Sequence, residues 1–189
     1  MLLNPDRIQD SLKRLHAARP DIFGADEHRF LLNPTMPEAQ AASFESEHNV
    51  QLPDEYRHFL TAIGNGGAGP FYGVFPFGLV DAGFGRTSWI DHEGVVGKLS
   101  EPFSPADKTT AWTKPDHLNP LPLNGAIPIC HIGCGLRIWL VIAGEKAGHL
   151  WYDGRAEHSG VTALSNADGS PTTFAMWYED WLIACLRSF

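Results

Sequence analysis

The chain has 189 residues, of which 43% are hydrophobic and 19% are charged, and its formal net charge is −8 at pH 7. A chain of this length can form one domain with a sizeable core, so a mini-protein held together by disulfides or metal ions is excluded. The aromatic share of 11% also excludes an intrinsically disordered chain. The acidic balance and the lack of any basic run argue against direct binding of DNA or RNA.

Three features indicate a cytoplasmic protein without a membrane span. The longest strongly apolar run, residues 138–143, is much shorter than the roughly 20 residues that a transmembrane helix needs. The first residues lack the basic start and apolar stretch of a secretory signal. The cysteines, Cys130, Cys134 and Cys185, are odd in number, which favours reduced thiols over a disulfide framework.

Two helices are predicted before residue 50. The first begins after Asn4, which can cap it and is followed by a proline typical of the first helical turn, and it ends before Pro20. Residues 35–38 have the pattern of a capping box with a proline inside it, and they predict a second helix that continues to His48.

A third helix has the clearest pattern of the amino-terminal half. Asp54 and Glu55 follow Pro53 and suit the positive end of a helix dipole. The glycine-rich residues 64–67 then predict the end of the helix. Between them, apolar side chains recur at helical spacing: Tyr56, Phe59, Leu60 and Ile63.

The second half of the chain predicts strands. Residues 71–77 form a first apolar segment, and residues 83–125 are an irregular passage rich in proline and glycine, with loops and short strands. Three clearer strands follow at residues 127–132, 136–142 and 149–152. Because short glycine-containing turns separate them, we expect an antiparallel meander.

The last helix begins near Thr172 and Thr173 and carries a broad apolar stripe. We expect this stripe to pack on one face of the sheet, with Trp177 and Trp181 mostly buried. Exposure of either ring would indicate a wrong helix assignment or an interface at this helix. Helices at both ends of an antiparallel sheet predict a single α+β domain.

One glycine motif has the sequence of a nucleotide-binding loop but not its surroundings. Residues 64–69 match the fingerprint G-x-G-x-x-G, and Asp91 lies near the position of the ribose-binding acid. That fingerprint holds pyrophosphate between a strand and a helix N-terminus, whereas here a helix precedes it and Pro70 follows. We interpret the glycines as a helix stop and a tight turn, and we predict no cofactor.

Cys130, His131 and Cys134 lack the spacing of a metal site. Structural zinc takes paired ligands, as in C-x-x-C, and alternation along a strand would point Cys130 and His131 to opposite faces. Small buried thiols are the favoured interpretation, so we predict no metal ligand. The signatures of zinc deaminases, serine hydrolases, P-loop enzymes and zinc proteases are also absent from the sequence.

Catalytic residues are not predicted either. A Cys–His pair adjacent in sequence is weak evidence for a nucleophile, because the fold, not the sequence, brings catalytic pairs together. Asp91, His92 and Glu93 form a local cluster of titratable groups on a predicted loop. An acid/base site would use such groups, but a solvated turn explains them equally well.

A series of motifs occurs along the chain in a fixed order. The earlier ones are LPDEYRHFL at 52–60, GNGG at 64–67 and GPFYGVFPF at 69–77. The later ones are IPICHIGCG at 127–135, LVIAG at 140–144, GHLWYD at 148–153 and FAMWYEDWL at 174–182. This series resembles the SUKH superfamily, specifically its domain of the yeast Smi/Knr cell-wall regulator type. We therefore divide the chain into a helical extension, residues 1–37, and a SUKH-like domain, residues 38–189.

The resemblance implies a non-enzymatic binding module. Bacterial members of the superfamily are mostly immunity proteins, encoded beside polymorphic or contact-dependent toxins that they neutralise by direct binding, and many of those toxins are nucleases. An acidic domain suits such a partner, because it could cover the basic substrate-binding face of a nuclease and complementary charge raises the association rate. The expected partner is thus a basic cognate toxin, without direct contact to nucleic acid or membrane.

We expect the contacts with this partner to come from exposed side chains. An interface of roughly 800 Å² per partner with a central aromatic or Arg anchor would be needed. The candidates are Tyr72, Asp91, His92, Glu93, Asp153 and Glu157.

Two other functions stay open on the sequence alone. One is a regulatory or scaffolding module of the cell-wall regulator type, which would bind several endogenous proteins at weaker affinity. The other is an enzyme or ligand-binding domain, which would show a concave site with convergent polar groups and strongly shifted pKa values.

Overall fold

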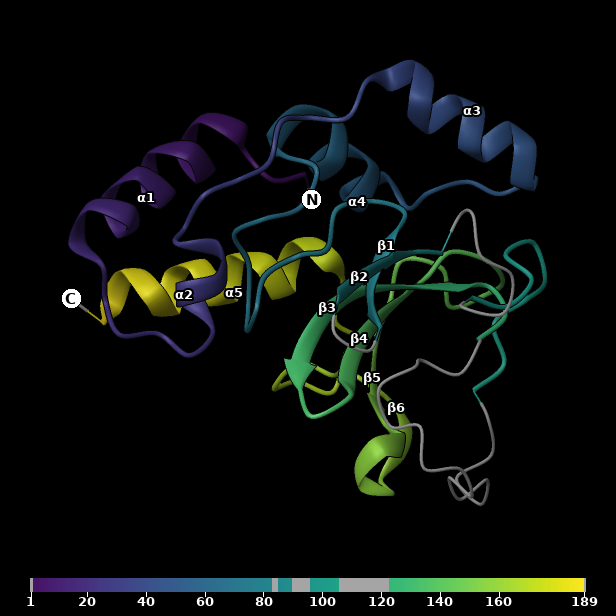
Figure 1. Cartoon of the computed structure of the whole chain (residues 1–189). Coiled ribbons are helices and arrows are strands. Elements are labelled where there is room, and N and C mark those ends of the chain that lie inside the picture. Colours follow the sequence, from purple (N-terminus) through teal and green to yellow (C-terminus); the bar gives the residue numbers. More distant parts are fainter. Residues whose placement is uncertain (1, 83–84, 90–95, 106–122, 189) are drawn as a thin grey trace.

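The computed structural model describes residues 2–82, 85–89, 96–105 and 123–188, with a group of helices on one side and an antiparallel sheet on the other (Figure 1). The helices are α1 (Pro5–Ala18), α2 (Ala25–His28), α3 (Glu38–His48), α4 (Asp54–His58) and α5 (Phe174–Arg187). The predicted α+β class is confirmed. Within the described residues, no helix is both long and apolar enough to cross a lipid bilayer.

The main sheet is a four-stranded antiparallel meander in the order β3–β4–β5–β6. Its strands are β3 (Ala126–Gly133), β4 (Leu136–Val141), β5 (Leu150–Gly154) and β6 (Gly160–Ala163). The three strands predicted there are confirmed, whereas β6, the short 3-10 helix η2 (Arg155–Glu157) and α2 escaped prediction. A separate two-stranded sheet, β1 (Leu79–Ala82) and β2 (Gly85–Ser88), precedes the meander in the chain.

The two faces of the main sheet bury different apolar clusters. Side chains alternate along β4, so Ile138 and Leu140 join the core that the helices share, while Trp139 lies on the opposite face. On that second face Trp151, which is opposite Trp139 in the strand register, packs against Phe103 with 4.9 Å between ring centroids. The sheet is therefore covered on both sides.

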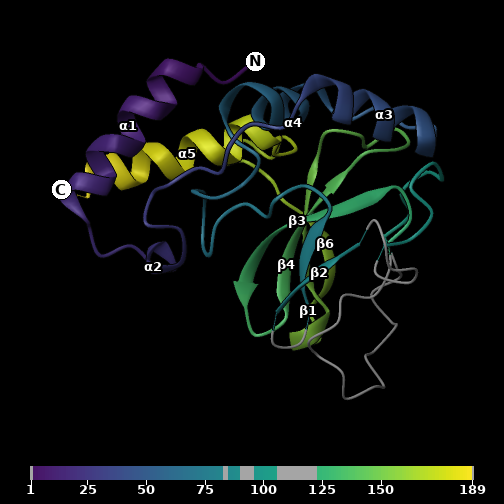
Figure 2. The same ribbon diagram turned by 45° about the horizontal axis from the view of Figure 1, so that its top comes forward.

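The amino-terminal helix α1 forms as its sequence predicts. The Asn4 side chain caps it by accepting a hydrogen bond from the Arg7 N–H at 2.9 Å. Its apolar stripe, which includes Ile8 and Leu15, is fully buried in the main core. Arg7 also forms an ion pair with Glu179 of α5, and Figure 2 shows the two helices inclined to each other with their carboxyl-terminal ends close together.

The closing helix α5 contacts α1 and α4, and its buried side chains share one apolar core with Ile138 and Leu140 of the sheet. Phe174 meets the rings of Tyr56 and Phe59 at centroid distances of 5.1 and 5.0 Å. Tyr178 is fully buried and donates its hydroxyl to the Ala68 carbonyl at 2.9 Å. The apolar stripe of α5 thus packs against aromatic residues of α4 and of the π-helical turn that continues α4.

Long-range contacts are made at the starts of two predicted helices. Helix α3 begins without a side-chain cap, because Glu38 forms an ion pair with Arg57 at 2.6 Å. Helix α5 begins after Thr173 without a side-chain bond from that residue, and the Glu55 carboxylate of α4 accepts from the Ala175 N–H at 3.0 Å instead. The capping box at residues 35–38 is therefore wrong, because Pro37 is the N-cap residue of α3, whereas α5 begins after Thr173 as expected.

Helix α4 continues as a π-helix, η1 (Phe59–Ile63), and then ends at the predicted glycine stop. The residues that follow, 64–78, form an extended segment that we call the connecting loop. The predicted strand at residues 71–77 is wrong, since only Val74 there makes a β-bridge. Positive φ angles at Phe71 (54°) and Gly73 (93°) turn the chain and prevent a regular strand.

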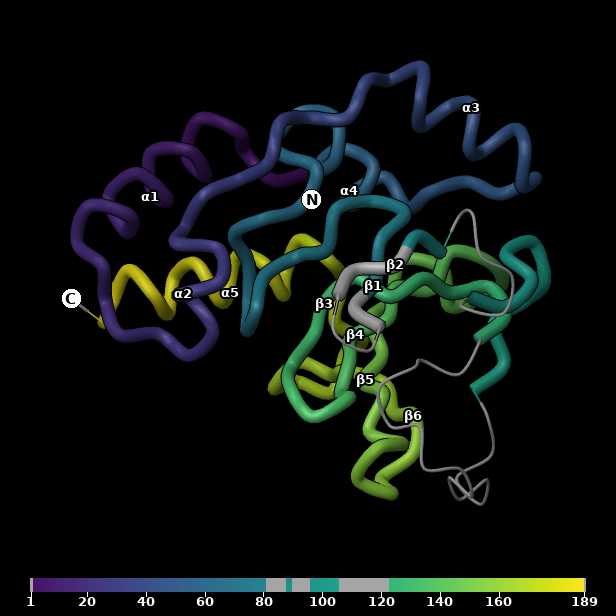
Figure 3. The backbone as a smooth tube through the Cα atoms, viewed as in Figure 1, coloured from purple at the N-terminus to yellow at the C-terminus, as the bar shows by residue number. Residues whose placement is uncertain are grey.

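The connecting loop joins the helices to the edge of the sheet. Single β-bridges link Leu32 to Gly67, Gly67 to Val74, and Val74 to Cys130 of β3. Gly67 exchanges two backbone hydrogen bonds with Val74, each 2.9 Å long. Figure 3 shows the loop descending from α4 towards α2 before it returns to β1. The sheet is in effect extended, through isolated bridges, into the amino-terminal segment.

A Tyr178→Phe variant tests the contact between α5 and the connecting loop. The substitution removes a fully buried hydrogen bond to the Ala68 carbonyl, and we expect a loss of about 1–2 kcal/mol of unfolding free energy in urea denaturation. Tyr152→Phe is the matched control, because its hydroxyl bonds to exposed Glu157. Equal effects of the two substitutions would contradict the assigned role of Tyr178.

Candidate functional site

A groove lies where the helices meet the sheet-side loops. Four segments of the chain converge on it, and it encloses about 610 Å³. We call it the aromatic groove and define it by Ile22, Phe23, Phe71, Leu164, Trp177 and Trp181. Trp177 and Trp181 line this groove and also pack against the main core, so neither ring is fully exposed and neither is fully buried.

A row of aromatic rings extends one wall of the groove. Phe23 is 63% exposed and meets the Tyr72 ring edge-on at 5.3 Å between centroids. Tyr72 in turn stacks on His131 of β3, also at 5.3 Å, with 25° between the ring planes. The structure thus places Tyr72, a residue that the sequence singled out, beside the groove and partly exposed.

Backbone geometry fixes the position of Phe23. Its neighbour Gly24 has φ of +79°, and a Cβ atom there would lie 2.2 Å from the Phe71 carbonyl oxygen. Only glycine permits both this φ angle and this close approach. The segment before α2 is therefore held against the connecting loop, which brings Phe23 to Tyr72.

His28 lies behind the groove and supports Trp181. The two rings meet edge-on at 5.9 Å, and His28 Nδ1 accepts a hydrogen bond from the Phe30 N–H at 3.0 Å. Burial lowers the pKa of His28 from 6.5 to about 4, because the imidazolium form would lose its hydration. The ring is thus neutral at physiological pH and acts as a packing element.

A second concave region, the polar cleft, lies at the amino-terminal end of α4 and encloses about 700 Å³. Its lining includes Glu45, Asp54, Arg57 and His149. Arg57 pairs with Glu45 at 3.3 Å and with Glu38 at 2.6 Å, so two of the nearby carboxylates are already neutralised within the chain. The chemistry of this cleft is consistent with structural ion pairing.

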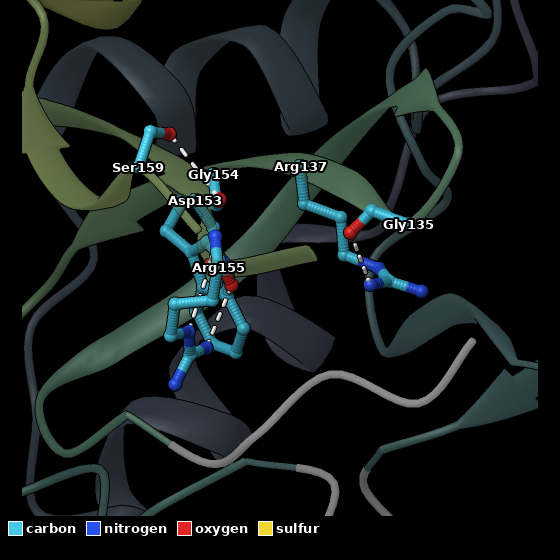
Figure 4. Close-up of polar contacts among 7 residues, drawn as sticks. Gly135, Arg137, Asp153, Gly154, Arg155 and Ser159 are labelled. Carbon is cyan, nitrogen blue, oxygen red and sulfur yellow. Dashed lines mark hydrogen bonds and ion pairs between the residues drawn. The ribbon is translucent and has the colours of Figure 1, made fainter. Parts of the chain in front are cut away.

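Asp153 is buried, with 3% exposure, so its expected place on the surface is wrong. Its carboxylate accepts two bonds from the Arg155 guanidinium, at 2.7 and 2.6 Å, and one from Trp139 Nε1 at 3.2 Å (Figure 4). Arg137, which is also buried, lies opposite Asp153 in the strand register and donates to the Gly135 carbonyl at 2.9 Å. This cluster anchors η2 to the sheet and is unavailable to a partner.

Glu157 is exposed, as expected, at the end of η2. It accepts hydrogen bonds from the Tyr152 hydroxyl at 2.5 Å and from the Ser159 hydroxyl at 3.1 Å. Partial burial and the adjacent Glu157 carboxylate raise the pKa of Tyr152 to about 12. The remaining predicted contacts, Asp91, His92 and Glu93, lie outside the described residues.

Two of the three cysteines are buried. Cys130 is fully buried, and its thiol donates to the Pro70 carbonyl at 3.3 Å. Cys185 is buried as well, whereas Cys134 is exposed in the β3–β4 turn, so the interpretation as core thiols fails for Cys134. Among the described residues, no group of three or more His, Cys, Asp or Glu side chains could hold a metal ion.

Sequence reasoning missed the groove residues Phe23 and Phe71. Gly24 and the sequence PFYG at residues 70–73 were the available signals, because glycine can mark a place where another backbone approaches closely. Nothing in the local sequence tells which two segments approach each other. The groove therefore becomes visible only in the folded chain.

A comparison with known protein families matches residues 36–169 to the SMI1/KNR4 family (SUKH-1). The match spans more than half of the chain and confirms the family resemblance drawn from the sequence motifs. It takes in α3 to β6 and leaves α1, α2 and α5 outside. No curated protein and no solved structure matches the chain.

An Asp153→Asn variant tests whether this residue serves stability or binding. Neutralising one member of a buried ion pair leaves the Arg155 charge uncompensated, and we expect a loss of about 3 kcal/mol or more of unfolding free energy. Glu157→Gln, at an exposed site nearby, should cost less than about 1 kcal/mol. Denaturant unfolding of both variants measures the difference, and an unaltered stability of Asp153→Asn would contradict the structural role.

The buried His28 gives the stability a pH dependence of known sign. Its folded-state pKa of about 4 lies below the ordinary 6.5, so the unfolded chain binds the proton first as the pH falls. Stability should therefore decline between pH 6.5 and 4, by up to about 3 kcal/mol from this group.

His28→Asn is the variant that isolates this contribution, because Asn can still accept the bond from the Phe30 N–H. The measurement is the slope of unfolding free energy against pH, compared between variant and parent over pH 4–7. The variant should have the shallower slope, and identical slopes would mean that His28 titrates alike in both states.

Proposed function

Because the chain belongs to the SMI1/KNR4 family (SUKH-1), we propose that it is a non-enzymatic, cytoplasmic protein-binding module of the immunity type. In this function it neutralises a cognate toxin by direct binding. The toxin's active face is covered, and no bond of the toxin is changed. The family match over residues 36–169 is the observation that carries this proposal.

The charge of the chain supports a basic partner. A net charge of −8 gives the molecule a negative potential that attracts a positively charged protein and accelerates the encounter. Toxins that cleave nucleic acid need basic surfaces to bind phosphate, so a nuclease is the toxin class that such an acidic chain complements best. The same charge disfavours nucleic acid as a direct ligand of this chain.

The described part of the chain supports binding over catalysis. In its polar cleft Arg57 pairs with the lining carboxylate of Glu45 and with nearby Glu38. The groups with strongly shifted pKa values include His28 and Tyr178, which are buried packing residues. Catalytic groups with shifted pKa values normally converge on a cleft that a substrate can enter. The partly exposed aromatic row beside the groove is instead typical of protein interfaces.

The decisive experiment pairs this chain with the toxin domain encoded beside its gene. Co-expression should restore growth of cells that produce the toxin, and the two proteins should co-purify as a stoichiometric complex. The association rate should fall as ionic strength rises, since screening weakens the attraction between opposite charges. A toxin domain from an unrelated locus serves as the control and should neither bind nor be neutralised.

Two results would contradict the proposal. Continued toxicity with no complex formation, tested for each secreted protein encoded next to the gene, would exclude the immunity function. Recovery of several endogenous partners at weak affinity, with no effect on toxicity, would indicate the regulatory or scaffolding function.

A further inference from the structure

We propose that the aromatic groove is the docking site for the toxin, and that the toxin fills it with an apolar side chain flanked by Lys or Arg. This inference rests on the proposed function and adds to it the place of contact and the chemistry of the contacting segment.

The exposed apolar side chains of the chain support this position. Among the described residues, the exposed large hydrophobic side chains are Leu2, Phe23, Leu31 and Met176. Phe23 lines the groove, and the sulfur of Met176 lies 3.8 Å from the amide of Asn166, which also lines it. Two of these four residues thus border one concavity, which is the arrangement expected for an interaction site.

The groove has the size of an anchor pocket. A volume of about 610 Å³ accommodates one or two large side chains. A whole interface needs roughly 800 Å² per partner, so the groove would form its centre while the row Phe23–Tyr72–His131 extends the contact towards β3. Tyr72 then takes part as a neighbour of the anchor.

Charge around the groove selects a basic partner. Asp180 lines it and is exposed, and no Lys or Arg is among the lining residues that the structure describes. Two further exposed carboxylates directly neighbour lining residues in the sequence, Asp21 beside Ile22 and Asp168 beside Ala167. Hydrogen bonds from Ser170 lower the pKa of Asp168 and keep it anionic. The one base of α5, Arg187, comes two turns after Asp180.

The groove is also rigid enough to act as a preformed site. The glycine contact between Gly24 and the Phe71 carbonyl fixes one wall, and the buried His28 and Phe30 rings back Trp181 on the other. Preformed walls reduce the entropy that a partner must remove on binding. A partner can therefore gain affinity here without reorganising the chain.

The first test is the Phe23→Ala variant, with Leu31→Ala as the matched control. Both side chains are more than half exposed, at 63% and 53%, so neither truncation should alter the melting temperature much. The probe is the toxin domain encoded beside the gene, and the measurement is its dissociation constant by titration calorimetry. We expect Phe23→Ala to weaken binding about 10- to 30-fold and Leu31→Ala to change it less than about threefold.

The second test exchanges charge at two concave sites. Asp180→Lys at the groove and Asp54→Lys at the polar cleft change the net charge equally, so any difference between them reports the place of contact. We expect Asp180→Lys to slow association with the toxin domain about tenfold and to weaken its salt dependence, while Asp54→Lys has a small effect.

The outcomes separate this inference from the proposed function. Tight binding that both Phe23→Ala and Asp180→Lys leave intact would overturn the groove as the docking site while leaving the immunity function in place. Loss of binding in Asp54→Lys alone would do the same and would move the contact to the polar cleft. Failure of the unaltered chain to bind the toxin domain would contradict both.

Discussion

The pairing of the connecting loop with both neighbouring parts of the chain is the interaction on which the rest of the structure depends. Leu32, Gly67, Val74 and Cys130 form a line of single β-bridges from the amino-terminal segment to the edge of the main sheet. At Gly67 a Cβ atom would lie 2.5 Å from the Leu31 carbonyl oxygen, so glycine is required for the close approach. A second backbone link joins the start of α5 to the sheet, where the Leu150 N–H donates to the Thr172 carbonyl at 3.0 Å.

The aromatic groove follows from this arrangement. Where two backbones lie this close together, no room is left between them for the neighbouring large side chains. Gly24 brings the α2 segment against Phe71, and the large rings on either side, Phe23 and Tyr72, are left partly in solvent. The core beneath them is closed by Tyr178, which bonds to the carbonyl of Ala68. A tightly held backbone thus carries an aromatic surface that the chain itself does not cover.

Elements that depend on residues close together in the chain could be predicted from the sequence. Predictions failed where contacts with residues far away in the sequence determine burial or capping. Helix α1 and the glycine-separated strands of the meander need only local caps, turns and alternation, and they formed as expected. Asp153 resembled a surface acid at a strand end. It is buried instead, and hydrogen bonds from Trp139 and Arg155 replace the hydration that its carboxylate loses. Likewise Glu55, rather than Thr173, bonds to the first turn of α5 from a helix far away in sequence.

The groove is built partly from residues inside the range that matches the family and partly from residues outside it. This division affects how selective the groove would be for one partner. Phe71 and Leu164 lie within residues 36–169, which match the family, whereas Phe23, Trp177 and Trp181 lie outside that range. A partner seated in the groove would touch both kinds of wall at once. The shared part would place the partner at the edge of the sheet, and the flanking helices would supply most of the aromatic surface that it contacts. Selectivity for one partner would then depend on residues outside the range that matches the family.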